Sequence, residues 1–153
     1  YTCVPYYAPI NTPNGDIKAE DIKVGDIVYG YDFESNKIVE TKVLKIGQPI
    51  RHELVKVYSE NGDVLEFTPN HAVYTDKGWC AYAPKECLEI EAGQLEVGQK
   101  ILSIDGNYYT ITNITLDIIK DTQFYDFTTE TSNFFTNNTL VHNARCIGNE
   151  VIF

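Results

Sequence analysis

Two segments of this chain share one pattern and predict how it folds: Ile17-Lys18-Ala19-Glu20-Asp21-Ile22-Lys23-Val24-Gly25-Asp26 and Ile90-Glu91-Ala92-Gly93-Gln94-Leu95-Glu96-Val97-Gly98-Gln99. Isoleucine, alanine, valine and glycine repeat in register between the copies that begin at residues 17 and 90, and Ile22 matches Leu95. Asp32 falls on Asp105 at the same offset, and a β-type run follows the glycine of each copy. A solenoid needs at least about three repeats, so two copies predict a pseudo-symmetric β fold of two halves.

The rest of the chain also favours strands. Residues 26–31, 53–58 and 109–116 alternate in polarity or are rich in β-branched residues, as strands are. Turn pairs recur between such runs, and Asn61-Gly62 between two alternating stretches predicts a hairpin. No long stretch shows a helical period, although one or two short turns are expected near residues 18–24 and 92–97. The fold class is therefore predicted to be all-β.

Composition limits the classes of function. The 153 residues suit one domain with a sizeable core, and 43% of them are hydrophobic. The net charge of −10 argues against nucleic-acid binding, which relies on lysine and arginine stripes. No apolar run approaches the roughly 20 residues of a membrane span, and no signal peptide is expected from the N-terminal residues. The four cysteines match no zinc-finger spacing and no disulfide framework, so neither a metal nor another cofactor is expected.

Chemically suggestive residues lie at the two ends and in the middle. Cys3 is the first residue of the largely apolar segment 3–10. Near the other end, His142-Asn143 follows the apolar pair Leu140-Val141. Between them lies Thr68-Pro69-Asn70-His71. A nucleophile at one boundary, a His-Asn pair at the other and an internal Thr-x-x-His form the layout of a domain that cuts its own backbone. The set resembles the intein and Hint-domain family, over roughly residues 3 to 143.

That resemblance implies a horseshoe of two related β subdomains, in which the first-residue nucleophile and the terminal asparagine meet. Residues 3–143 would then be an autoprocessing domain, with residues 1–2 as the upstream flank and residues 144–153 as the downstream flank. The implied partners are these flanks of its own host polypeptide, and the domain would act as a monomer. The host would be a bacterial protein, either cytoplasmic or secreted. The span 83–94 is too short for the homing endonuclease of larger inteins, so no DNA cutting is expected.

Cys3 is the predicted nucleophile for the bond that precedes it. Its sulfur can attack the Thr2 carbonyl through a five-membered ring and convert the amide into a thioester. This shift is uphill, so the amide nitrogen must be protonated or the bond strained. His71 is the candidate acid, because imidazole suits proton transfer near neutral pH. The resemblance implies that Thr68, and possibly Asn70, hydrogen-bond near the Thr2 carbonyl.

At the other end, the side-chain amide of Asn143 can attack its own carbonyl, form a succinimide and break the bond to Ala144. His142 is placed to polarise that carbonyl or to protonate the leaving nitrogen. Residues 123–128 and 133–135 resemble the family's penultimate motif, which implies that Asp126 lies near Cys3 and assists proton movement. A strand-edge carboxylate is the alternative reading of Asp126.

Three departures from the family pattern affect the expected outcome. Ala8 replaces a common Thr or Ser, residues 131–133 lack the second histidine of the penultimate motif, and Ala144 lacks the nucleophile that follows the asparagine in inteins. The last departure resembles type A bacterial intein-like domains and predicts mainly cleavage, with ligation minor. Cys146, in the downstream flank, is interpreted as incidental, although a displaced acceptor or a pairing with Cys3 is also conceivable. A zinc site at Cys3, His71 and His142 would be inhibitory, not a cofactor.

Two other functions are weighed against this one. Cys3 with a histidine would also give the dyad of a cysteine hydrolase that acts in trans. An inert β module for binding is the second alternative, and it predicts a precursor that never cleaves. Under the favoured reading the reaction is single-turnover and intramolecular, so the domain is not a turnover enzyme.

Overall fold

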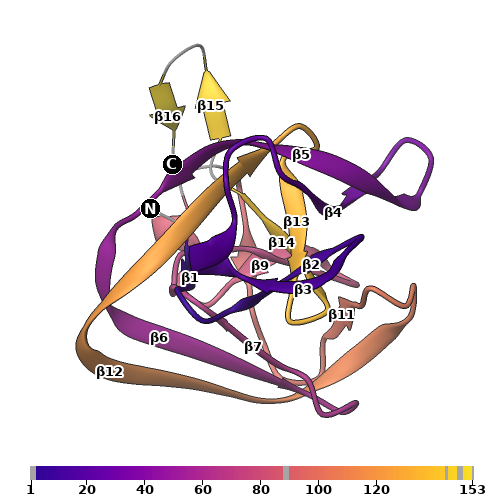
Figure 1. Cartoon of the computed structure of the whole chain (residues 1–153). Helices are drawn as coiled ribbons and strands as arrows, with labels where there is room; N and C mark the ends of the chain where they lie inside the picture. The colour runs from indigo at the N-terminus through magenta and orange to yellow at the C-terminus, as the bar shows by residue number, and fades with distance from the viewer. Residues whose placement is uncertain (1–2, 88–89, 144, 148–149, 153) are drawn as a thin grey trace.

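The computed structural model describes residues 3–87, 90–143, 145–147 and 150–152 (Figure 1). The described residues form sixteen strands and two short 3₁₀ helices, η1 and η2, which loops and turns connect. The elements of the first part are β1 (Val4–Pro5), β2 (Pro9–Thr12), β3 (Gly15–Lys18), η1 (Ala19–Asp21), β4 (Ile27–Asp32), β5 (Lys37–Gly47), β6 (Ile50–Ser59) and β7 (Val64–Phe67). Those of the second part are β8 (Val73–Thr75), β9 (Gly78–Ala81), η2 (Pro84–Glu86), β10 (Gly93–Gln94), β11 (Lys100–Leu102), β12 (Tyr108–Thr129), β13 (Asn133–Thr136), β14 (Thr139–His142), β15 (Arg145–Ile147) and β16 (Glu150–Ile152).

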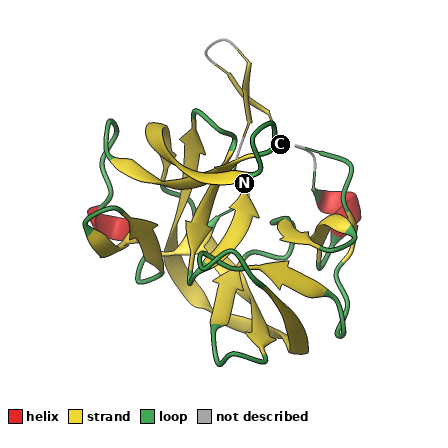
Figure 2. Ribbon diagram, turned by 90° about the vertical axis from the view of Figure 1, so that its right-hand side faces the viewer, coloured by secondary structure: helices red, strands yellow, loops and turns green. Residues whose placement is uncertain are grey.

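The longest strand, β12, connects the two halves of the fold. It runs for 22 residues and pairs in turn with β11, β6, β1 and β5. Together with β6 it forms the long curved ribbon at the lower left of Figure 1. The all-β horseshoe expected from the sequence is confirmed, and strands dominate the ribbon in the orthogonal view of Figure 2. No helix of the described residues is long and apolar enough to span a bilayer.

The sequence repeat corresponds to a structural repeat. Gly25 and Gly98 have φ of +94° and +96°, a left-handed conformation that only glycine adopts without strain. The Gly25 amide donates to the Val43 carbonyl at 2.8 Å, and the Gly98 amide donates to the Ile111 carbonyl at 2.9 Å. Val43 and Ile111 each donate back to the residue after the glycine, at 2.9 and 2.8 Å. Each copy therefore fixes the same turn against a strand of its own half.

Two matching hairpins extend the repeat beyond the segments that the sequence revealed. In the β2–β3 hairpin, Thr12 Oγ1 donates to the Gly15 carbonyl at 2.5 Å. In the β8–β9 hairpin, Thr75 Oγ1 donates to the Gly78 carbonyl at 2.8 Å. Both glycines have positive φ, as these tight turns require.

Of the two segments expected to form short turns, only the first contains a helix. The first falls on η1, whereas the second contains β10 and ends in a turn in which the Gln99 amide donates to the Glu96 carbonyl at 3.3 Å. The other 3₁₀ helix, η2, lies earlier in the chain. β10 pairs in parallel with β9, and the Leu95 amide donates to the Ala81 carbonyl at 3.0 Å. Backbone pairing with β9 thus replaces the local hydrogen bonds of a helix. The predicted hairpin at Asn61-Gly62 joins β6 to β7, and Gly62 has φ of +93°.

The main hydrophobic core contains residues from both halves of the chain, and the strands that hold the candidate site run through it. Its largest fully buried side chains include five phenylalanines: Phe67, Phe124, Phe127, Phe134 and Phe135. β14 pairs with β13 on one side and with β8 on the other. β1 pairs with β12 through Val4 and Tyr125. The start of β1 and the end of β14 are therefore both held by buried strands.

Candidate functional site

Cys3 is fixed to the end of β7 by two reciprocal hydrogen bonds. Its backbone amide donates to Thr68 Oγ1 at 3.0 Å, and the Thr68 amide donates to the Cys3 carbonyl at 3.0 Å. Both residues are buried, because β1 lies on β12 and β7 ends at Phe67 just before Thr68. The threonine hydroxyl therefore contacts the amide nitrogen of the bond before Cys3. The Thr2 carbonyl, to which it was expected to donate, lies outside the described residues.

Burial holds the Cys3 thiol in its protonated form. Removal from water raises its pKa to about 12, while the positive charge of Arg51 opposes the rise and the carboxylate of Asp126 adds to it. A hydrogen bond from the Thr68 side chain also lowers the thiol pKa. At neutral pH the sulfur thus needs a proton acceptor before it becomes a strong nucleophile.

The imidazole of His71 lies between the two ends of the candidate domain. Its Nδ1 is 3.3 Å from the Cys3 carbonyl oxygen, and its Nε2 is 2.5 Å from the His142 carbonyl oxygen. The rings of Phe67 and Phe134 lie 5.4 and 6.3 Å from its centroid. One side chain therefore contacts the backbone at Cys3 and at the penultimate residue of the domain.

His71 is neutral at physiological pH. Burial lowers its pKa to about 4, although its two backbone hydrogen bonds work in the opposite direction. A neutral imidazole has one N–H and so satisfies only one of its two carbonyl acceptors at a time. The resting ring is therefore neutral, and we expect it to accept a proton before it donates one to the amide nitrogen.

His142 and Asn143 form a second local arrangement at the end of β14. His142 Nδ1 donates to the Asn143 carbonyl oxygen at 2.7 Å, and the Asn143 amide donates to the Ser132 carbonyl at 3.2 Å. Asn143 is 1% exposed, yet among the described residues neither its Oδ1 nor its Nδ2 has a hydrogen-bond partner. A buried primary amide without partners is costly and calls for an explanation.

Asp126 also lies at this site, on β12. Its carboxylate is 5% exposed and is close enough to Cys3 to raise the thiol pKa. Gly47 on β5 pairs with it, and a Cβ at residue 47 would lie 2.3 Å from Asp126 Oδ1. The carboxylate therefore occupies space that only a glycine leaves open.

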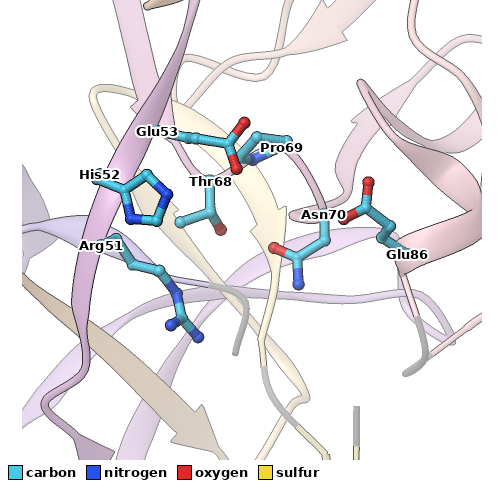
Figure 3. Close-up of a pocket in the computed structure, with 7 residues that line it drawn as sticks. All are labelled: Arg51, His52, Glu53, Thr68, Pro69, Asn70 and Glu86. Atoms are coloured by element: carbon cyan, nitrogen blue, oxygen red, sulfur yellow. The ribbon is translucent and has the colours of Figure 1, made fainter. Parts of the chain in front are cut away.

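Asn70 lies apart from these contacts, in an open pocket of about 270 Å³ beside Thr68 (Figure 3). Charged and polar side chains dominate this pocket, and its lining residues are Arg51, His52, Glu53, Thr68, Pro69, Asn70 and Glu86. The closeness of Asn70 to the Thr2 carbonyl falls outside the described residues. So do the residue at position 144 and the side chain of Cys146.

Three contributors to the site were missed in the sequence: Arg51, Gly47 and Trp79. The ring of Trp79 lies 5.0 Å from that of His142. Nothing in their local sequence distinguishes them, because each acts across a strand pairing that the sequence does not reveal. Among the described residues no group of three or more His, Cys, Asp or Glu side chains is arranged to hold a metal ion.

Comparison with known proteins gives consistent matches. A family model described as the pretoxin HINT domain matches residues 9–146. The solution structure of a bacterial intein-like domain from Clostridium thermocellum is 29% identical, with a TM-score of 0.77 over 92% of this chain and 98% of that one. A DnaB intein from Synechocystis sp. PCC 6803 is 16% identical, with a TM-score of 0.77 over 95% of this chain and 100% of that one. No curated protein sequence matches the chain.

Proposed function

Because this chain belongs to the pretoxin HINT domain family and has the intein fold of self-processing domains, we propose that it cuts its own backbone before Cys3 and after Asn143. The carrying observation is the position of His71, whose ring contacts the Cys3 carbonyl and the His142 carbonyl together. A shared imidazole at both ends of segment 3–143 is what joint processing requires. It has no evident purpose in an inert β module.

The upstream step is an N-to-S acyl shift. The Cys3 sulfur attacks the Thr2 carbonyl carbon, a C–S bond forms, the C–N bond breaks, and the thiol proton ends on the new Cys3 amine. Neutral His71 is suited to accept the thiol proton and return it to the nitrogen, with Asp126 assisting its movement. Thr68 contacts that nitrogen, and Asn70 is proposed to complete the surroundings of the Thr2 carbonyl.

The downstream step is cyclisation of Asn143. Its Nδ2 attacks its own carbonyl carbon, the C–N bond to Ala144 breaks, and a proton lost by Nδ2 ends on the leaving nitrogen. A succinimide and a free amine result. His142 Nδ1 donates to the oxygen on which negative charge develops, as an oxyanion-hole donor does. The unpartnered amide of Asn143 fits this role, because no hydrogen bond to another group holds its nitrogen away from its own carbonyl.

Ala144 determines the products. Its methyl group cannot accept the acyl chain from Cys3, so the branched ester of ordinary splicing does not form. The thioester is then released to water or to an added thiol, and Asn143 cyclises independently. The family description also leads us to propose that the host is a toxin precursor. Cleavage is the main result, and ligation through the freed Ala144 amine is minor.

Burial argues against the trans-acting hydrolase. Cys3 is 0% exposed and His71 is 1% exposed, so a separate polypeptide has no access to the pair. An added peptide that is cleaved by the purified domain would revive that alternative.

The test is a precursor with a folded tag on each side, followed by intact mass over time with and without an added thiol. Cys3→Ala is expected to abolish upstream cleavage, and Asn143→Ala to abolish downstream cleavage. Cys87→Ala and Asn113→Ala are matched controls, since the first is a buried cysteine elsewhere and the second an exposed asparagine. A precursor that stays intact overturns the proposal, and a large majority of ligated product overturns its predicted outcome.

A further inference from the structure

Trp79 is the only tryptophan of the chain, and its ring contacts the histidine of the downstream step. The ring centroids of Trp79 and His142 lie 5.0 Å apart, and the ring planes are 89° apart. This is the edge-to-face arrangement that aromatic rings prefer. Trp79 comes from β9, which is separated from β14 by β8, so the contact spans two strand pairings.

Other aromatic rings hold Trp79 in place. Tyr74, its partner across the β8–β9 hairpin, lies 5.1 Å away at 66°, and Phe33 lies 6.0 Å away at 69°. Trp79 also packs against the buried cluster that contains Ala72, whose carbonyl accepts the His142 amide at 2.9 Å. Tryptophan and histidine are therefore fixed to the same piece of backbone.

The orientation of the His142 ring decides whether it can act on Asn143. Rotation about χ2 of histidine is broad and roughly two-fold, so a half-turn would exchange Nδ1 for a carbon. The donor to the Asn143 carbonyl would then be lost, although the ring would occupy the same volume. A ring packed at a right angle resists this rotation because the turning imidazole must sweep through it.

We propose that Trp79 is a positioning residue for Asn143 cyclisation, which keeps His142 Nδ1 directed at the Asn143 carbonyl oxygen. The inference rests on the proposed function and adds to it a residue that contacts neither reacting atom. Upstream cleavage at Cys3 is not affected by this role. The two processing steps are therefore expected to respond differently to substitutions at residue 79.

The test compares Trp79→Leu and Trp79→Phe in the tagged precursor. Trp79→Leu is expected to slow downstream cleavage by about tenfold or more, because misdirecting a catalytic donor is costly. Trp79→Phe keeps a ring at the site and is expected to remain within about threefold of the parent. Thiol-induced cleavage before Cys3 is the folding control and should be unchanged in both variants. A parallel loss of both cleavages in the leucine variant overturns the proposal.

Two further measurements separate positioning from general packing. In the His142→Ala background, Trp79→Leu should cause no further slowing, because the two residues act as a unit. Nitrogen NMR of the His142 ring, in an Asn143→Ala chain, should show one Nδ1–H form in the parent and a mixture in Trp79→Leu. Equal slowing in both backgrounds, or an unchanged ring signal, refutes the inference. A parent chain that never releases residue 144 refutes the proposed function instead.

Discussion

Burial of His71 makes the stability of this domain depend on pH in a defined window. The folded-state pKa is lowered from 6.5 to about 4, so between these values the unfolded chain binds the proton that the folded chain does not. The contribution of His71 is complete above pH 6.5 and is lost as the pH falls to about 4. The whole interval corresponds to about 3 kcal/mol, at about 1.4 kcal/mol per pH unit.

The perturbation is a replacement of His71 by glutamine, which is polar but does not titrate. Both chains carry Cys3→Ala and Asn143→Ala, so that processing does not interfere. Between pH 7 and pH 4.5 the histidine chain should lose about 2 kcal/mol more unfolding free energy than the glutamine chain. The comparison between chains removes the contribution of carboxylates and of the other two histidines, which both chains share.

Denaturant unfolding at several pH values measures this difference directly. Intrinsic fluorescence of the single tryptophan follows the transition. Equal losses in the two chains would refute the reasoning, because they would mean that His71 titrates alike when folded and unfolded. A greater loss in the glutamine chain would show that His71 is protonated in the folded state.

Two further substitutions test the geometry around the site. Gly47→Ala should displace the Asp126 carboxylate, since the new Cβ would lie 2.3 Å from its Oδ1, and thiol-induced upstream cleavage should slow about tenfold or more. Gly93→Ala is the matched control, because its Cβ would meet nothing closer than 3.3 Å, and an unchanged rate in Gly47→Ala would contradict the role of Asp126. Asn133→Ala should cost about 2 kcal/mol in thermal or denaturant unfolding, because Asn133 pairs with both backbone groups of Tyr31 at 2.7 and 3.0 Å. A cost below about 0.5 kcal/mol would mean that solvent replaces both bonds.

Much of the architecture could be predicted because the turns and strands have residue types that favour these structures locally. The Asn61-Gly62 turn and the paired glycines at residues 25 and 98 need backbone angles that few residues allow, so they are visible in the sequence. The strand β10 within residues 92–97 could not be predicted, because it depends on pairing with β9. The continuity of β12 could not be predicted, since its length depends on which strands meet it.

In the candidate site, too, some residues could be predicted from the sequence, whereas others depend on strand pairing. Cys3, His71, His142 and Asn143 are predicted from their layout along the chain and its resemblance to the intein family, and the structure brings them into one buried region. The partner of the Thr68 hydroxyl is the Cys3 amide, a detail that depends on the exact offset between β1 and β7. Trp79 could not be predicted, because its contact with His142 depends on strand order and not on spacing.

The complete burial of the Cys3 sulfur has a consequence for the lifetime of the acyl intermediate. An activated ester shielded from solvent is consumed only as fast as the protein opens around it. Bulky and compact mercaptans of equal acidity should then cleave the thioester at different rates. Destabilising β1 should shorten the half-life of the thioester more than a change in the nucleophilicity of the mercaptan. Opening of the fold would thereby set the rate at which the thioester is cleaved.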